Sequence, residues 1–220
     1  MMNFDQSLRI RHSMVRVSSG GLRAELRLPL KPVGLVLVAH GNGLPAARAR
    51  AVAAVLNQYR LASVLVDLLD EAEAVDRRNV FNIRLLAGRI EDTLDWADSH
   101  AELGSLRVGL SGAGTGAAAA LWAASDRSGT VMAVVCINGR PDLANLRLDH
   151  VQSPTLLIVG GDDTQGLAVN RAALRRLPCG KRLEVVPGAN HVFDPPGALD
   201  AAAQLAGAWF DNHLASVRMS

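Results

Sequence analysis

Four short clusters of glycine and polar residues could carry chemistry, and each follows an apolar run. They are His40-Gly41-Asn42-Gly43, Gly112-Ala113-Gly114-Thr115-Gly116, Asp162-Asp163 and Gly188-Ala189-Asn190-His191. Along the chain they supply a tight glycine-rich turn, then a carboxylate, then a histidine. A carboxylate that orients a histidine beside a nucleophile, with backbone N–H groups facing the carbonyl oxygen, catalyses acyl transfer. The order therefore indicates a site for attack on a carbonyl group.

The segments between these clusters alternate between expected strands and expected helices. Apolar runs rich in Val, Leu and Ile predict strands buried on both faces of a parallel sheet, at Val33–Ala39, Ala62–Asp67, Leu106–Leu110, Val131–Ile137, Thr155–Val159 and Arg182–Val186. Longer Ala-rich runs predict helices at about Arg48–Tyr59, Ile83–Ser99, Thr115–Ala124, Leu167–Leu177 and Gly197–His213. Reactive groups collect beyond the carboxyl ends of such strands, so the four clusters should share one sheet edge.

A hairpin is expected before these units, over Ser13–Leu30, with its turn at residues 18–21. The prediction is one domain over residues 1–220 with an α/β fold: a mostly parallel sheet, helices on both faces and an N-terminal antiparallel hairpin. No internal repeat or long linker interrupts it.

The glycine-rich turn lacks the hydroxyl that this chemistry requires. In the pattern Gly-x-Ser-x-Gly the serine stands on a strained turn between a strand and a helix, and Gly114 occupies that position here. Three interpretations stay open: natural loss of activity, removal of the serine by engineering or sequence error, and an active enzyme with another nucleophile. Ser111 and Thr115 are the nearest substitutes, but Ser111 would force several glycines into the start of a helix. Thr115 is β-branched and would point away from the site.

Taken together, these motifs make the chain similar to the dienelactone hydrolase-like branch of the α/β-hydrolases. The resemblance extends from about Ser13 to His213. It rests on residues 36–43 (VLVAHGNG), 66–69 (VDLL), 139–144 (GRPDLA), 154–161 (PTLLIVGG) and 187–193 (PGANHVF). Some members of that branch are fused to a phosphoribosyltransferase domain, for which this chain is too short. Relatives tend to carry a longer Ser-, Arg- and His-bearing loop where this chain has Leu44-Pro45-Ala46-Ala47.

The resemblance implies a role for each cluster. Asp163 would be the triad acid, His191 the general base, and the N–H groups of Asn42 and Thr115 the oxyanion hole, while the family's serine falls on Gly114. The implied function is hydrolysis of a carboxylic ester or lactone, impaired or lost at Gly114. The alternative is a non-catalytic receptor or partner protein that keeps the pocket for a small carbonyl or carboxylate ligand.

Two further residues have more than one interpretation. Arg140 could orient a substrate carboxylate by bidentate pairing, or form an ion pair with Asp142 or another neighbour. Cys136 lies inside an apolar run, which favours a core residue over a nucleophile.

Composition argues against several other classes of protein. The net charge is +2, from 23 basic and 21 acidic residues without a basic run, so no nucleic-acid partner is expected. No run reaches the ~18–20 apolar residues that a membrane span needs, and the start lacks a secretory signal. With only two cysteines, a cytoplasmic location is expected. The histidines show no metal-ligand spacing, so no metal or cofactor is expected. A homodimer through the final helix stays an open alternative.

Overall fold

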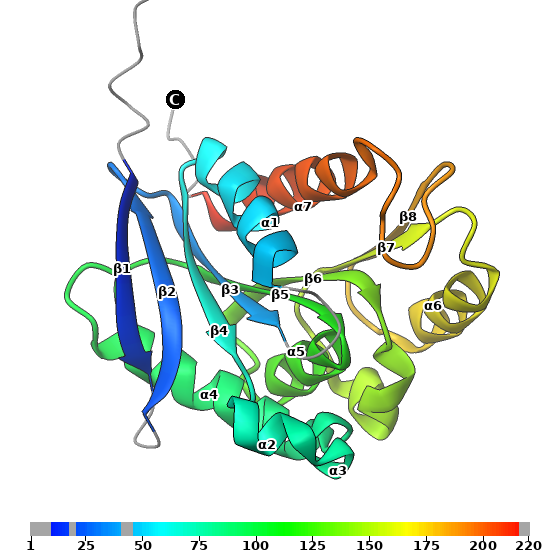
Figure 1. Cartoon of the computed structure of the whole chain (residues 1–220), viewed down its shortest axis with the longest axis horizontal. Helices are drawn as coiled ribbons and strands as arrows, with labels where there is room; N and C mark the ends of the chain where they lie inside the picture. The colour runs from blue at the N-terminus through cyan, green and yellow to red at the C-terminus, as the bar shows by residue number, and fades with distance from the viewer. Residues whose placement is uncertain (1–9, 18–20, 41–45, 216–220) are drawn as a thin grey trace, which may run out of the picture.

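Eight strands form one sheet in the computed structural model, which describes residues 10–17, 21–40 and 46–215 (Figure 1). The strands are β1 (Ile10–Val17), β2 (Leu22–Pro29), β3 (Gly34–His40), β4 (Leu61–Asp67), β5 (Val108–Gly114), β6 (Val131–Gly139), β7 (Thr155–Gly160) and β8 (Lys181–Val186). Their order is β1-β2-β4-β3-β5-β6-β7-β8. β1 with β2 and β2 with β4 pair antiparallel, and every other neighbouring pair is parallel. This confirms the predicted α/β fold and its N-terminal hairpin.

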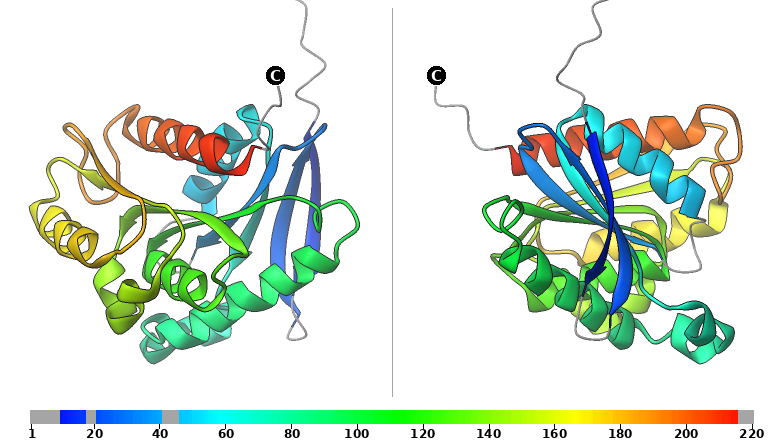
Figure 2. Two further views of the ribbon diagram at one scale, coloured as in Figure 1. Left: turned by 180° about the vertical axis from the view of Figure 1, so that it is seen from behind. Right: turned by 60° about the vertical axis from the view of Figure 1, so that its left-hand side comes forward.

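Helices cover both faces of the sheet, because the buried strands carry apolar side chains on both sides. α1 (Ala46–Gln58) and α7 (Ala198–Leu214) pack on one face, and α4 (Ile83–Ser99), α5 (Thr115–Asp126) and α6 (Thr164–Arg176) on the other (Figure 2). In β3 the alternation is plain: Leu35 and Leu37 join the α4–α5 core, whereas Val36 and Val38 join the α1–α7 core. The sheet is thus the middle layer of three.

The clearest differences between the observed and the predicted elements lie at three places. β5 continues to Gly114, whereas the sequence predicted an end at Leu110; its small residues fit between β3 and β6 and extend the ladder. α6 begins at Thr164 rather than Leu167, because the Asp163 side chain caps its first turn. The helices α2 (Glu71–Val75) and α3 (Arg77–Val80) were not predicted, since they are too short to show a helical period. The 3₁₀ segment η2 (Pro141–His150) was not predicted either, because a kink at Asn145 interrupts it.

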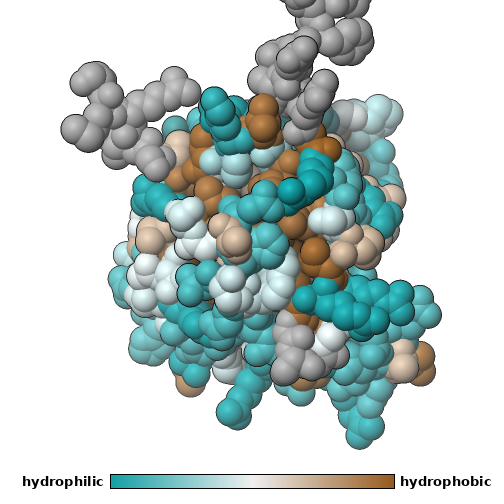
Figure 3. All heavy atoms as spheres, turned by 90° about the vertical axis from the view of Figure 1, so that its left-hand side faces the viewer, coloured by the Kyte–Doolittle hydropathy of each residue, from teal (hydrophilic) through white to brown (hydrophobic). Residues whose placement is uncertain are grey.

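The hairpin end of the sheet presents a mainly hydrophilic surface (Figure 3). β1 is an edge strand, and among its side chains Arg11, His12 and Arg16 are charged or polar, while Met14 is exposed. Charged side chains on an exposed edge discourage pairing with a further strand.

Candidate active site

A sharp turn joins β5 to α5, and Gly114 stands at its apex. Gly114 has φ 54° and ψ −126°, a positive-φ conformation that residues other than glycine rarely adopt, and Thr115 is the first helical residue. Gly112 makes the turn compact, because a Cβ there would overlap the backbone of Gly116. The N-terminus of α5 therefore opens directly behind residue 114, where backbone N–H groups can face an oxyanion.

Asp163 and His191 meet at the same sheet edge, beyond the carboxyl ends of β7 and β8. The Nδ1 atom of His191 lies 2.7 Å from Oδ2 of Asp163. Asp163 is also the N-cap of α6, where its Oδ1 accepts a hydrogen bond of 2.8 Å from the Gly166 N–H. The neighbouring Asp162 is exposed, and its N–H donates to the Ala189 carbonyl at 3.0 Å. That bond ties the end of β7 to the loop that carries His191.

Electrostatics favour an ionised acid next to this histidine. Burial alone would raise the pKa of the Asp163 carboxyl, but hydrogen bonds from the His191 ring and the Gly166 N–H outweigh it, so its pKa lies below the usual value. A carboxylate at Nδ1 holds the proton there and leaves the Nε2 lone pair free to act as a base. The side chain of His191 is 65% exposed, so that base is open to solvent and to ligands.

Strand β6 connects the turn to the acid–histidine pair. Gly114 pairs with Gly139 of β6, and the Arg140 N–H donates to the Gly114 carbonyl at 3.0 Å. Asn138, one residue before Gly139, contacts His191 through its side-chain amide. Two adjacent residues of β6 thus lie between the apex of the turn and the histidine.

The remaining candidates lie in different surroundings. Ser111 is buried within β5 and lines a cavity of about 10 Å³ under the turn. Burial raises the pKa of the Cys136 thiol to about 12, which removes it as a nucleophile at neutral pH. Arg140 forms a bidentate pair with Asp142, with N–O distances of 2.8 and 2.7 Å. Asn42 lies outside the described residues.

Three polar contacts near the site were not predicted from the sequence. Asn138 contacts His191, His40 Nδ1 lies 2.9 Å from Asp67 Oδ1, and Arg48 of α1 pairs with Asp194 three residues after His191. The signal for Asn138 was present: an amide stands at the end of an otherwise apolar run, before the Gly139–Arg140 stretch. The other two pairs join residues that only the folded sheet brings together.

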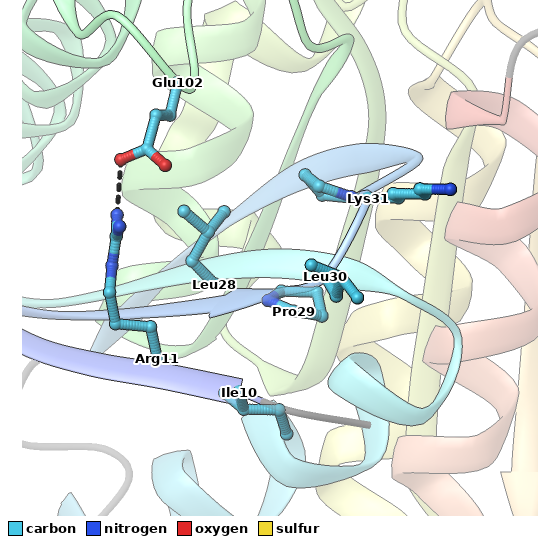
Figure 4. A pocket seen from close by; sticks show the side chains of 8 residues that line it. Ile10, Arg11, Leu28, Pro29, Leu30, Lys31 and Glu102 are labelled. Atoms are coloured by element: carbon cyan, nitrogen blue, oxygen red, sulfur yellow. Dashed lines mark hydrogen bonds and ion pairs between the residues drawn. The ribbon is translucent and has the colours of Figure 1, made fainter. Parts of the chain in front are cut away.

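A separate hollow lies at the opposite end of the sheet, where β3 and β5 begin. We call this the hairpin groove; its volume is about 410 Å³. Its lining residues are Ile10, Arg11, Leu28, Pro29, Leu30, Lys31, Pro32 and Glu102 (Figure 4). Arg11 and Glu102 form an ion pair across it. The groove therefore shares no lining residue with the acid–histidine pair.

Metal-binding clusters and membrane-spanning helices are both absent from the described residues. Within residues 10–17, 21–40 and 46–215, no group of three or more His, Cys, Asp or Glu side chains is placed to hold a metal ion. In the same part of the chain, no helix combines the length and the apolar character that a membrane crossing requires.

Solved structures of other proteins have the same fold as this chain. A dienelactone hydrolase from Anabaena variabilis is 45% identical, with a TM-score of 0.88, over 94% of this chain and 99% of that protein. Est1E from Butyrivibrio proteoclasticus has a TM-score of 0.74 at 13% identity, over 91% of this chain and 98% of that protein. At this low identity, the similarity shows only that the two proteins share a fold. No family model matches the chain.

Curated relatives carry a different name. A Mycobacterium tuberculosis protein named as a proposed phosphoribosyl transferase is 46% identical over 209 residues, which are 93% of this chain and 47% of that protein. The chain therefore spans about half the length of these relatives.

Proposed function

The chain belongs to the dienelactone hydrolase-like α/β-hydrolases, and from this premise we propose that its Asp163–His191 site acts on the carbonyl group of a carboxylic ester or lactone. One observation carries the proposal: His191 Nδ1 lies 2.7 Å from Asp163 Oδ2, at the sheet edge where β5 turns into α5. A carboxylate–imidazole pair beside a helix N-terminus is what attack on an acyl carbon requires.

Gly114 limits the chemistry to slow hydrolysis in this proposal. Loss of a serine nucleophile costs roughly 10⁶-fold in kcat, while about 10³–10⁴-fold over water survives through binding and the oxyanion hole. A water molecule replaces the serine hydroxyl as nucleophile. Its oxygen bonds to the carbonyl carbon, its proton passes to His191 Nε2, and the N–H groups of Thr115 and Asn42 receive the oxyanion. The oxyanion then re-forms the carbonyl as the bond from the acyl carbon to the alkoxide oxygen breaks, and the same proton passes from His191 Nε2 to that alkoxide oxygen. No acyl-enzyme forms.

Restoring the hydroxyl tests this proposal. We expect Gly114→Ser to raise ester hydrolysis by at least roughly 10²-fold and to give a covalent adduct with a fluorophosphonate, because His191 can then deprotonate a serine. Initial rates and intact-protein mass spectrometry measure both effects. Gly129→Ser is the matched control: Gly129 also has a positive φ, is exposed and lies in the α5–β6 connection.

The outcomes separate the proposal from its rivals. An acyl adduct on the unsubstituted chain would overturn water attack and point to Ser111 or Thr115 as nucleophile. A well-folded Gly114→Ser protein without activity or adduct would overturn the hydrolase site. The second candidate function, a receptor for a small carbonyl or carboxylate ligand, is favoured by the missing hydroxyl at Gly114.

The longer relatives are named phosphoribosyl transferases, and we propose that this name does not describe the activity of this chain. The chain matches 47% of their length. We assign the transferase activity of such relatives to the half that this chain does not match.

A further inference from the structure

We infer that Asn138 is a positioning residue, which fixes the backbone of His191 and bounds its ring so that Nδ1 stays beside the Asp163 carboxylate. This inference rests on the proposed function, since it concerns the same base. Asn138 ends the apolar part of β6 and is 7% exposed. Its Nδ2 donates to the backbone carbonyl of His191 and lies 2.7 Å from the ring Nδ1.

The orientation of the amide follows from its partners. The His191 carbonyl can only accept, so the NH₂ group of Asn138 faces it rather than the amide oxygen. Ring Nδ1 forms one in-plane hydrogen bond, and a carboxylate is a stronger partner than a neutral amide. The Nδ1 proton therefore belongs to Asp163, at 2.7 Å, while Asn138 fixes the backbone of His191 and bounds the ring on a second side.

Asn138 maintains this contact at two energetic costs. Its φ is +48°, in the left-handed region that favours glycine. Its Oδ1 is buried and has no hydrogen-bond partner in the described part of the chain. Backbone strain and an unpaired buried acceptor persist together only where the surroundings impose them, and such strain collects at functional sites.

A closed set of hydrogen bonds supplies the constraint. Asn170 of α6 is fully buried, and its Nδ2 donates to the Gly139 carbonyl at 3.2 Å and to the Gly166 carbonyl at 2.9 Å. The Gly166 N–H in turn donates to Asp163, which bonds to His191. The acid and the Asn138–Gly139 pair are thus both anchored on α6, and His191 is held from both sides.

Asn138→Gly is the decisive variant, because glycine accepts a φ of +48° and removes only the amide. Long-range ¹H–¹⁵N spectra of the His191 ring report which nitrogen carries the proton. We expect mainly the Nδ1–H form in the unsubstituted chain, and in the variant a shift toward the tautomer mixture of N-acetylhistidine in the same buffer. In the Gly114→Ser background we expect kcat to fall about tenfold, with KM unchanged within about twofold.

Asn145→Gly is the matched control, since Asn145 also has φ +48° but is exposed in η2. It should change neither the ring spectrum nor kcat. Asn138→Asp provides a second variant of nearly the same shape: its carboxylate cannot donate to the His191 carbonyl but can accept from Nδ1–H, so the ring should keep its Nδ1 proton. Unchanged ring spectra in Asn138→Gly, or equal changes in Asn145→Gly, would overturn the inference. Because the spectra need no activity, they decide it even where Gly114→Ser proves inactive and the hydrolase proposal fails.

Discussion

Each oxygen of the Asp163 carboxylate has its own partner, the His191 ring on one side and the Gly166 N–H on the other. Asp163→Asn keeps the shape but places an amide donor toward Nδ1, which favours the Nε2–H tautomer and removes the base. In the Gly114→Ser background we expect kcat to fall by about 10⁴-fold, the size of such a tautomer error in a serine triad. Asp162→Asn is the matched control, and steady-state ester hydrolysis compares the two.

The same carboxylate makes stability depend on pH. Its pKa is lower in the folded chain than its ordinary value of about 3.9, because its hydrogen bonds outweigh its burial. The ionised form therefore stabilises the fold fully above about pH 4, and this contribution is lost as the pH falls through the folded pKa. The Tm difference between the unsubstituted chain and Asp163→Asn should shrink as the pH is lowered from 6 to about 3. A difference that grew on acidification would contradict the lowered pKa.

At the scale of elements, the contact between α7 and β5 leaves no room for a side chain at Gly109. A Cβ there would lie 2.5 Å from Cε1 of Phe210, which is fully buried. We expect Gly109→Ala to cost about 1–3 kcal/mol, because the Phe210 ring must shift within a packed core. Gly88→Ala is the contrasting variant: in α4 nothing lies within 4 Å of its Cβ, so the helix should gain roughly 0.5–1 kcal/mol. Urea unfolding of both variants tests the pair, and destabilisation by Gly88→Ala as well would contradict the packing argument.

The sequence predicted well the strands that are buried on both faces of the sheet. It predicted poorly the element ends that are set by a helix cap or by the register between two strands. β3 and β7 are continuous apolar runs, and such runs leave few alternatives to a buried parallel strand. The start of α6 depends on the Asp163 side chain, and the length of β5 depends on how Gly114 pairs with Gly139. Neither contact leaves a periodic pattern in the chain. The Asn138–His191 contact joins residues 53 apart and needed the assembled sheet edge.

At the scale of the whole molecule, the sheet separates two chemically different ends. The acid–histidine pair lies beyond the carboxyl ends of β7 and β8, whereas the hairpin groove lies where β3 and β5 begin. A strand of seven residues rises roughly 23 Å, so the two sites are further apart than the ~7–10 Å within which substitutions usually couple.

This separation predicts that changes at the two ends add. Arg11→Gln removes the ion pair with Glu102 in the groove, where both side chains are about half exposed, so its effect on stability should be small. Combined with Gly114→Ser, it should leave kcat and KM as in Gly114→Ser alone, because no described contact joins Arg11 to β6, β7 or the His191 loop. Ester hydrolysis by the two single variants and the double variant measures the coupling. A change in kcat of more than about threefold on adding Arg11→Gln would show that the sheet transmits strain from its hairpin to its catalytic edge, and would make the groove part of the functional site.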